Sequence, residues 1–293
     1  MPRYEGTIWR PPSEARSLIL QATIGCSHNA CTFCVSYKKK RYKLRGAKAI
    51  EDDLAALPQR ILENVTRVFL ADGNALVMES DELGAVLEVL HDRLPRLARV
   101  GIYGYAKDVT TKTSEELREL HNLGLGIVYL GIETGDDELL QWVRKGISSR
   151  ENIEACTRIR DAGISLSLTV ILGLGGKENS HRHAIATARA LNAIDPEYVG
   201  ALTLMIPDGT PLHGMVQRGE FLPMAPMEIL EELRTLVENL ELTNCVFRTN
   251  HASNYLPIGG TLDEDKEGIL SILRRIIDEG DESMLRPQYT RGL

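Results

Sequence analysis

The amino-acid sequence predicts an α/β fold built on parallel strands. Short apolar runs rich in β-branched residues alternate with amphipathic stretches from residue 17 to about 240. Several of these runs are followed by polar or glycine-rich segments. Because each helical crossover returns the chain to the same edge of a sheet, strands in such a series run parallel. With right-handed crossovers, the result is either an open doubly wound sheet or a partial barrel.

Six apolar runs are expected to form the strands. They cover residues 17–24, 65–70, 99–105, 126–132, 164–172 and 198–206. The almost continuous apolar run at 166–172 is typical of a strand that is buried on both faces of its sheet. After residue 244 the pattern changes to a strand-like opening, a turn at 257–260, a helix and a polar tail.

Amphipathic helices are expected between the strands. Apolar residues recur at spacings of three and four around 83–94 and 117–123. Ser114 precedes two glutamates and a leucine, so its hydroxyl is a candidate N-cap for the second of these helices.

Composition limits the functional class. The 293 residues carry a net charge of −7, with 43% hydrophobic and 26% charged residues, which excludes a disordered or collagen-like chain. Aromatics at 5% and the acidic balance make nucleic-acid binding unlikely. The first residues lack a signal-peptide pattern, and no apolar run reaches about 18 residues. With only five cysteines, the protein is therefore expected in a reducing cytoplasm and not in a membrane.

Three of the cysteines lie together on one loop. Cys26, Cys31 and Cys34 follow the first expected strand, and thiols this close indicate a shared metal. A [4Fe–4S] cluster with one iron left open is one interpretation. Zinc completed by His28 or an outside ligand is another, and three structural core cysteines are a third. Cys156 is expected to be a core thiol, and Cys245 is isolated.

Other distinctive residues also follow strands. The segment 72–74 follows the second expected strand, Tyr105 ends the third, Glu133 ends the fourth and the glycines of 173–176 follow the fifth. Ligands bind at the carboxyl ends of parallel strands, so these residues are expected at one functional edge.

The cysteine loop, with Phe33 just before the last cysteine, resembles the cluster motif of the radical S-adenosylmethionine (radical SAM) superfamily. Its spacing of four and then two residues departs from the usual three and two. The segments 131–135, 160–164, 171–178 and 208–212 resemble the elongator-subunit, methylthiotransferase and coproporphyrinogen oxidase branch. The resemblance covers roughly residues 17–215.

The resemblance implies a partial (β/α)6 barrel over residues 17–240, preceded by an N-terminal arm (1–16) and followed by a C-terminal extension (241–293) that closes the cavity. It implies one [4Fe–4S] cluster held by the three cysteines, and SAM as the second cofactor. Reductive cleavage of SAM would give methionine and a 5′-deoxyadenosyl radical that abstracts hydrogen from a small-molecule or peptide substrate, in oxygen-poor cells. A porphyrin-precursor decarboxylase and a methyl-transfer enzyme remain open within the superfamily, and a non-enzymatic zinc-binding module remains open outside it.

The resemblance also assigns contacts to SAM. Phe33 would lie near the adenine, Glu133 would accept from the ribose hydroxyls or the amino group, and Arg144 would bind the carboxylate. Asp72, Gly73 and Asn74 resemble the segment that binds the methionine amino group, although Asn74 replaces an acid. Gly173 and Gly175 would let the backbone approach the nucleoside. A tight turn at 72–74 and an exposed helix-end arginine at 144 are the structural alternatives.

Residues 38–45 hold six cations and are called here the basic strip. The strip is expected to dock an acidic electron donor such as flavodoxin or ferredoxin, or to attract an anionic substrate, unless it is only a solvated face. The candidate catalytic residues are His251, Asn254, Tyr255 and Tyr105, whose side chains can donate hydrogen bonds or a proton.

Overall fold

The structure is a computed structural model that describes residues 2–292. The chain forms two compact units. The first comprises Met1–Asn29, Ser36–Leu130 and Glu154–Leu166, and the second comprises Ala30–Val35, Gly131–Ile153 and Ser167–Leu293.

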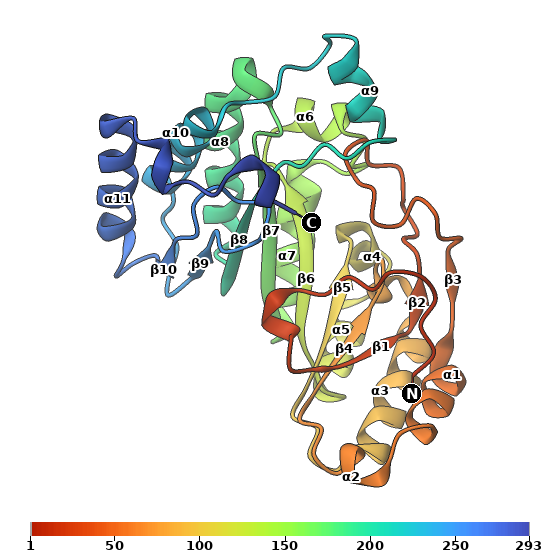
Figure 1. Ribbon diagram of the computed structural model, residues 1–293. Helices are drawn as coiled ribbons and strands as arrows, with labels where there is room; N and C mark the ends of the chain where they lie inside the picture. The colour runs from red at the N-terminus through yellow and green to blue at the C-terminus, as the bar shows by residue number, and fades with distance from the viewer. Residues whose placement is uncertain (1, 293) are drawn as a thin grey trace. The chain divides into compact units, whose positions relative to one another are not determined.

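The first unit is built on parallel strands in the order β1-β4-β5-β6 (Figure 1). They are β1 (Leu18–Gln21), β4 (Arg67–Ala71), β5 (Arg99–Gly104) and β6 (Leu125–Glu133), whose last three residues belong to the second unit. In the register of the first pair, Leu18 lies opposite Val68 and Leu20 opposite Leu70. The first four predicted strands are present, and they are parallel as the crossover argument required. The first is shorter than predicted, because it ends at Gln21 and residues 23–24 form a separate strand in an antiparallel pair.

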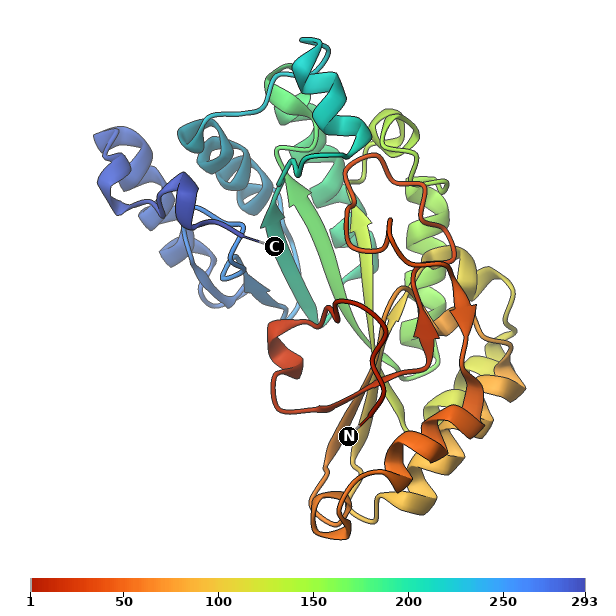
Figure 2. The ribbon, with the colours of Figure 1, turned by 45° about the vertical axis from the view of Figure 1, so that its right-hand side comes forward.

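Helices cover one side of these strands, and the N-terminal arm covers the other (Figure 2). Ile8 packs on a cluster formed by Phe69, Ala71, Ile127 and Tyr129. The hydroxyl of Tyr4 donates to the carbonyl of Ile19 (2.7 Å), and Ser13 lies 2.9 Å from the hydroxyl of Tyr129. Successive side chains of a strand point to opposite faces, so the residues under the arm are those that the helices do not cover.

The helices of the first unit include the predicted amphipathic pair, α3 (Ser80–Arg93) and α5 (Ser114–Asn122). The predicted N-cap is off by one residue. The side chain of Thr113 accepts from the amide of Glu116 at 3.1 Å, while Ser114 is the first helical residue. The other elements are η1 (Pro12–Glu14), α1 (Gly46–Ala55), α2 (Gln59–Leu62), η2 (Ala75–Val77), α4 (Ala106–Thr110), α7 (Ser149–Asp161), and the antiparallel pair β2 (Thr23–Ile24) and β3 (Lys43–Leu44).

The second unit carries the strands β7 (Ser165–Leu172), β8 (Tyr198–Thr203) and β9 (Val246–Arg248), which run parallel, and β10 (Gly259–Thr261), which pairs antiparallel with β9. The last two predicted strands are thus confirmed. The strand and the helix expected after residue 244 are also present. The turn expected at 257–260 is wrong, because Gly259 and Gly260 pair with β9 as part of β10 and the chain turns earlier, at 252–253. The helices are α6 (Asp137–Trp142), α8 (Gly176–Ile194), α9 (Pro211–Gln217), α10 (Pro226–Glu238), α11 (Lys266–Glu279), η3 (Glu282–Met284) and η4 (Gln288–Thr290).

The fold class is α/β with mostly parallel strands, as predicted. Cys156 on α7 has no exposed surface, and burial raises the pKa of its thiol to about 12, so it is the core thiol that the sequence predicted. No helix among residues 2–292 has both the length and the apolar character needed to cross a membrane.

Gly135 and Gly268 give opposite tests of the packing. A β-carbon at Gly135 would overlap the backbone carbonyl of Ala186 on α8, whereas one at Gly268 on α11 would meet nothing within 4 Å. Gly135→Ala is expected to destabilise the protein by about 3 kcal/mol, because the turn or the helix must shift. Gly268→Ala is expected to stabilise it by roughly 0.5–1 kcal/mol through helix propensity. Urea unfolding of both variants measures the difference, and equal effects would contradict the packing described.

Candidate cluster and cofactor site

Cys26, Cys31 and Cys34 are free thiols with partly exposed side chains. Cys26 belongs to the first unit, and Cys31 and Cys34 belong to the second. Among residues 2–292, no three His, Cys, Asp or Glu side chains already converge as a metal-binding group. The backbone around each cysteine is nevertheless held by contacts within its own unit.

The turn at 72–74 supports the start of the cysteine loop. The carboxylate of Asp72 accepts from the amide of Gly25 through Oδ2 (3.0 Å). A side chain at Gly73 would overlap the backbone of Gly25 and Cys26. Asn74 accepts from the amide of Ser27 (3.1 Å) and donates to its hydroxyl (2.8 Å). Glycine at position 73 therefore allows this turn to lie against the backbone of the cysteine loop.

Lys40 is part of this support, and its role was not foreseen. Its ammonium donates to Asp72 Oδ2 at 2.6 Å and to the carbonyl of Thr7 at 2.7 Å. Its side chain is 8% exposed, and that of Asp72 is fully buried. A buried carboxylate is costly unless a cation pairs with it, so Lys40 and Asp72 depend on each other.

Asn74 also connects the loop to α4. It donates to Asp108 Oδ2 (2.7 Å), which accepts from the amide of Tyr105 as well (3.0 Å). Burial raises the pKa of Asp108 to about 6, despite these hydrogen bonds. The ring of Tyr105 stacks on that of His28, with centroids 5.0 Å apart.

The second half of the loop is anchored in the second unit. Thr32 donates from its amide to the carbonyl of Val143 (3.0 Å) and accepts at its carbonyl from the amide of Leu212 (3.1 Å). Phe33 packs against the apolar cluster of Val143, Ile171 and Leu174. The ring of Phe33 thus has a packing role here, and its predicted contact with adenine stays a prediction.

Glu133 ends β6 with a left-handed backbone (φ 64°), which is unusual for a residue other than glycine. Its carboxylate accepts from the ammonium of Lys145 at 2.7 Å, and each side chain is 10% exposed. Lys145 neutralises a carboxylate that would be costly to bury alone. No role was predicted for Lys145, although it directly follows Arg144 in the sequence. Arg144 is exposed and also has a left-handed backbone (φ 56°).

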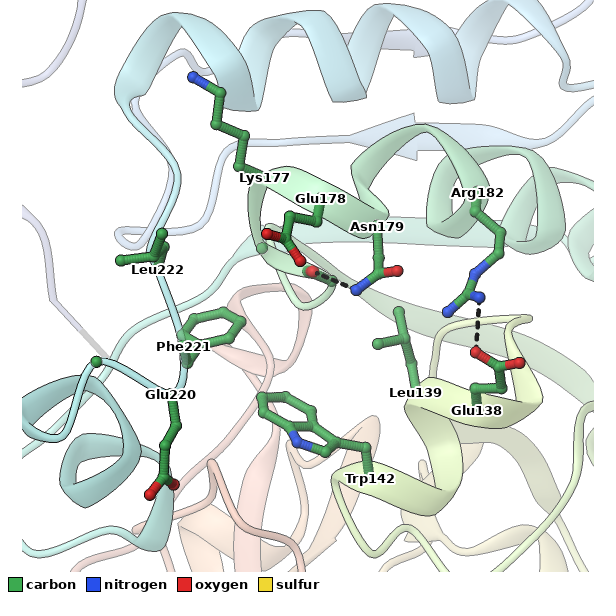
Figure 3. Close-up of a pocket in the computed structure, with 13 residues that line it drawn as sticks. Glu138, Leu139, Trp142, Lys177, Glu178, Asn179, Arg182, Glu220, Phe221 and Leu222 are labelled. Atoms are coloured by element: carbon green, nitrogen blue, oxygen red, sulfur yellow. Dashed lines mark hydrogen bonds and ion pairs between the residues drawn. The ribbon is translucent and has the colours of Figure 1, made fainter.

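The glycine turn after β7 begins α8. Gly173 has φ 81°, and its amide donates to the buried carboxylate of Glu232 at 2.6 Å. Gly175 is the N-cap of α8 and lines a pocket of about 380 Å³ (Figure 3). The rings of Trp142 and Phe221, with centroids 5.3 Å apart, form one wall of the pocket. The other lining residues are Glu138, Leu139, Gly176, Lys177, Glu178, Asn179, Arg182, Gly219, Glu220 and Leu222.

The candidate catalytic residues near the C-terminus are largely held by neighbours. Asn254 accepts from the hydroxyl of Thr203 (2.8 Å) and donates to the carbonyl of Ala201 (2.9 Å), so both ends of its amide bind β8. The hydroxyl of Tyr255 donates to Gln288 (2.7 Å), and Arg291 lies over its ring.

His251 is better suited to proton transfer than Asn254 or Tyr255. The amide of Ser253 donates to its Nδ1 at 3.1 Å, which leaves the proton of a neutral ring on Nε2. Burial, assisted by Arg286, lowers the pKa of the ring. His251 is therefore neutral near pH 7.

The donor set fits the cofactors that the sequence suggested. Three free thiols on one loop supply three cluster ligands, and the amide of Asn29 donates to the sulfur of Cys26 at 3.5 Å. One oxygen of Asp72, Oδ1, is buried without a hydrogen-bond partner among the described residues. Such an acceptor beside the loop suits a ligand that carries an amino group.

Comparison with known proteins agrees with this reading. Residues 20–188 match the family model described as the radical SAM superfamily. The heme chaperone HemW of Bacillus subtilis is 22% identical over 222 residues, which cover 72% of this chain and 56% of that protein. A tRNA-2-methylthio-N(6)-dimethylallyladenosine synthase of Dehalococcoides mccartyi is 31% identical over 56% of this chain and 39% of its own.

The fold is also found among solved structures. Coproporphyrinogen III oxidase (HemN) from Escherichia coli superposes with a TM-score of 0.55 at 17% identity, over 76% of this chain and 52% of that chain. This likeness concerns the fold alone, and the chain spans about half the length of these proteins. The family match covers more than half of the chain and includes the cysteine loop, the turns at 133–136 and 171–176, and helix α8 up to residue 188. The chain therefore belongs to the radical SAM superfamily.

Proposed function

We propose that the protein is an enzyme that cleaves SAM reductively and uses the resulting radical on an organic substrate. Three free cysteines within nine residues, on a loop braced at both ends, are the observation that carries this proposal. When bound, one [4Fe–4S] cluster would supply the electron that cleaves SAM to methionine and a 5′-deoxyadenosyl radical, which abstracts hydrogen from the substrate. The proposed compartment is a reducing, oxygen-poor cytoplasm, because clustered thiols oxidise readily.

The chain's own residues would bind and orient the cofactors. Cys26, Cys31 and Cys34 would hold the cluster as thiolates. Asn74 and Asp72 would keep the loop in place through Ser27 and Gly25. Hydrogen bonds within each unit hold the backbone at Ser27 and at Thr32, which limits the local reorganisation needed when the cluster is inserted.

Glu133 and Arg144 are proposed to bind the polar groups of SAM. Lys145 occupies Oε1 of Glu133, so hydroxyl or amino donors of SAM would bind Oε2. The positive φ at Glu133 and at Arg144 is a local strain, and strain of this kind gathers at ligand-binding sites. Gly173 and Gly175 would present backbone to the nucleoside.

The family match weakens the zinc alternative. Residues 20–188 match the radical SAM superfamily model, whereas a structural zinc site needs a fourth ligand beside the three cysteines. The proposal therefore assigns the three thiols to an iron–sulfur cluster with an open iron.

Anaerobic reconstitution tests the proposal directly. With SAM and dithionite, the wild-type protein is expected to form 5′-deoxyadenosine, and Cys31→Ala is expected to lose both bound iron and product, because two thiolates cannot hold the cluster. Cys156→Ala is the matched control, since that thiol is buried in the core and is expected to retain both. Iron analysis and chromatography of the products make the measurement. A colourless protein with one equivalent of zinc, or an intact cluster without product, would refute the proposal.

We also propose that an acidic electron donor docks on the basic strip, but only part of the strip is available. Lys38 donates to the carbonyl of Asn29 (2.6 Å), and Lys40 is buried against Asp72. Lys43 pairs with Glu5 (2.7 Å) and Arg45 with Asp53 (2.8 Å). Lys39 and Arg41 are exposed, and they are the cations that support the docking proposal.

Charge reversal at these two positions tests the docking surface. Lys39→Glu combined with Arg41→Glu is expected to slow reduction by flavodoxin about tenfold at low salt, because opposite charges steer association. Reduction by dithionite, a small reagent, should not change. Arg60→Glu on α2 is the control for a single charge reversal at another exposed site. Stopped-flow absorbance of the cluster makes the measurement, and equal slowing with both reductants would show that the cluster itself had been altered.

A further inference from the structure

A buried polar network lies behind the two turns that are proposed to bind SAM. His183 on α8 and Glu232 on α10 are each 2% exposed. Both belong to the second unit, as do the turns at 133–136 and 171–176. Neither residue touches the cysteine loop in any contact described above, and neither was a candidate in the sequence analysis.

Glu232 fixes the glycine turn after β7. Its Oε1 accepts from the amide of Gly173 at 2.6 Å, a charge-assisted hydrogen bond that reaches 59 residues along the chain. Gly173 has a left-handed backbone (φ 81°), so the chain after it leaves the direction of strand β7. The carboxylate therefore stabilises a backbone conformation that the chain would otherwise leave readily.

His183 links this turn to the turn after β6. Its Nε2 lies 3.0 Å from the carbonyl of Ile171 and 3.6 Å from the carboxylate of Glu232. A carbonyl can only accept, so Nε2 carries the hydrogen. Nδ1 then accepts from the hydroxyl of Thr134, at 2.7 Å.

The same helix holds the rest of the turn after β6. The oxygen of Thr134 accepts from the amide of Asp136 at 3.0 Å, and Thr187 accepts from the amide of Gly135 at 3.1 Å. Glu133, which is proposed to bind SAM, immediately precedes this turn. Movement of His183 or Thr187 would thus be transmitted to Glu133 through one or two peptide units.

Packing alone does not account for Glu232. Its Oε2 is buried and has no hydrogen-bond partner among the described residues. Its hydrogen bond among the described residues is with the amide of Gly173, so the side chain acts as an acceptor for this turn.

We propose that Glu232 and His183 are positioning residues. They would hold the turns at Glu133 and Gly173 in the relative position that SAM binding requires. This inference rests on the proposed function, because it assigns the turns at Glu133 and Gly173 to SAM. Neither residue contacts the reacting atoms. They act through the amide of Gly173 and the hydroxyl of Thr134.

Variants at Glu232 separate positioning from packing. Glu232→Ala is expected to weaken SAM binding by the reconstituted enzyme about tenfold, as the loss of one charge-assisted hydrogen bond would. Glu232→Gln keeps an acceptor for Gly173 and is expected to bind SAM within about threefold of wild type. The KM for SAM should rise with the dissociation constant, while kcat changes little. Glu231→Ala, an exposed neighbour on α10, is the matched control.

Hydrogen exchange on the protein without SAM supplies a readout that does not depend on activity. Glu232→Ala and His183→Ala are expected to speed amide exchange at 134–136 and 171–174 while leaving the other strands protected. The exposed His181→Ala is the control on α8. Thr134→Val, which keeps the side-chain volume, replaces either variant if it does not fold, and it should weaken SAM binding similarly.

The possible outcomes can be told apart. Weaker SAM binding together with local exchange at the two turns supports the inference. Unchanged SAM binding in Glu232→Ala, or faster exchange spread evenly over the chain, overturns it. A wild-type protein that binds no SAM would instead refute the proposed function. Equilibrium dialysis of the wild-type protein with SAM, done before the variants are compared, measures this.

Discussion

The buried ion pair between Lys40 and Asp72 is the contact on which the candidate site most depends. Asp72 has no exposed surface, and one oxygen of its carboxylate holds both the ammonium of Lys40 and the amide of Gly25. The next residue must be glycine, because the backbone of Cys26 lies where a side chain would be. The position of Cys26 in the cysteine loop thus depends on the turn at 72–74, almost fifty residues later in the sequence. Burying the two charges costs desolvation free energy, and the pair holds the backbone of the cysteine loop at Gly25.

The elements of the fold were largely readable from the sequence. All six predicted strands have a counterpart in the structure, because short apolar runs rich in β-branched residues indicate strands without knowledge of their neighbours. Burial on both faces was expected for 166–172, but β7 alternates between buried and partly exposed residues as far as Val170. The cap at Thr113 was misplaced by one residue, since Ser114 and Thr113 can both accept a first-turn amide and only the backbone angles decide.

The partners of the site residues could not be read in the same way. The carboxylate at Glu133 was recognised, but Lys145, which neutralises it, was not. Asn254 was predicted as a candidate catalytic residue, but the hydrogen bonds that both ends of its amide make with β8 were not foreseen. Glu232 gave no signal, because on an amphipathic helix it resembles its exposed neighbours. Such pairings join residues far apart in sequence, and periodicity carries information only about local burial.

The contacts between the N-terminal arm and the basic strip affect the charge that this surface presents. Glu5 pairs with Lys43, the carbonyl of Thr7 accepts from Lys40, and the carbonyl of Arg3 accepts from Arg45. The positive charge that the strip presents to solvent is therefore partly set by a segment more than thirty residues earlier. Glu5 contributes a side chain to these contacts, whereas Thr7 and Arg3 contribute backbone carbonyls that any residue supplies. A mutation of Glu5 alone would therefore raise the positive charge of this surface while every residue of the strip stays the same.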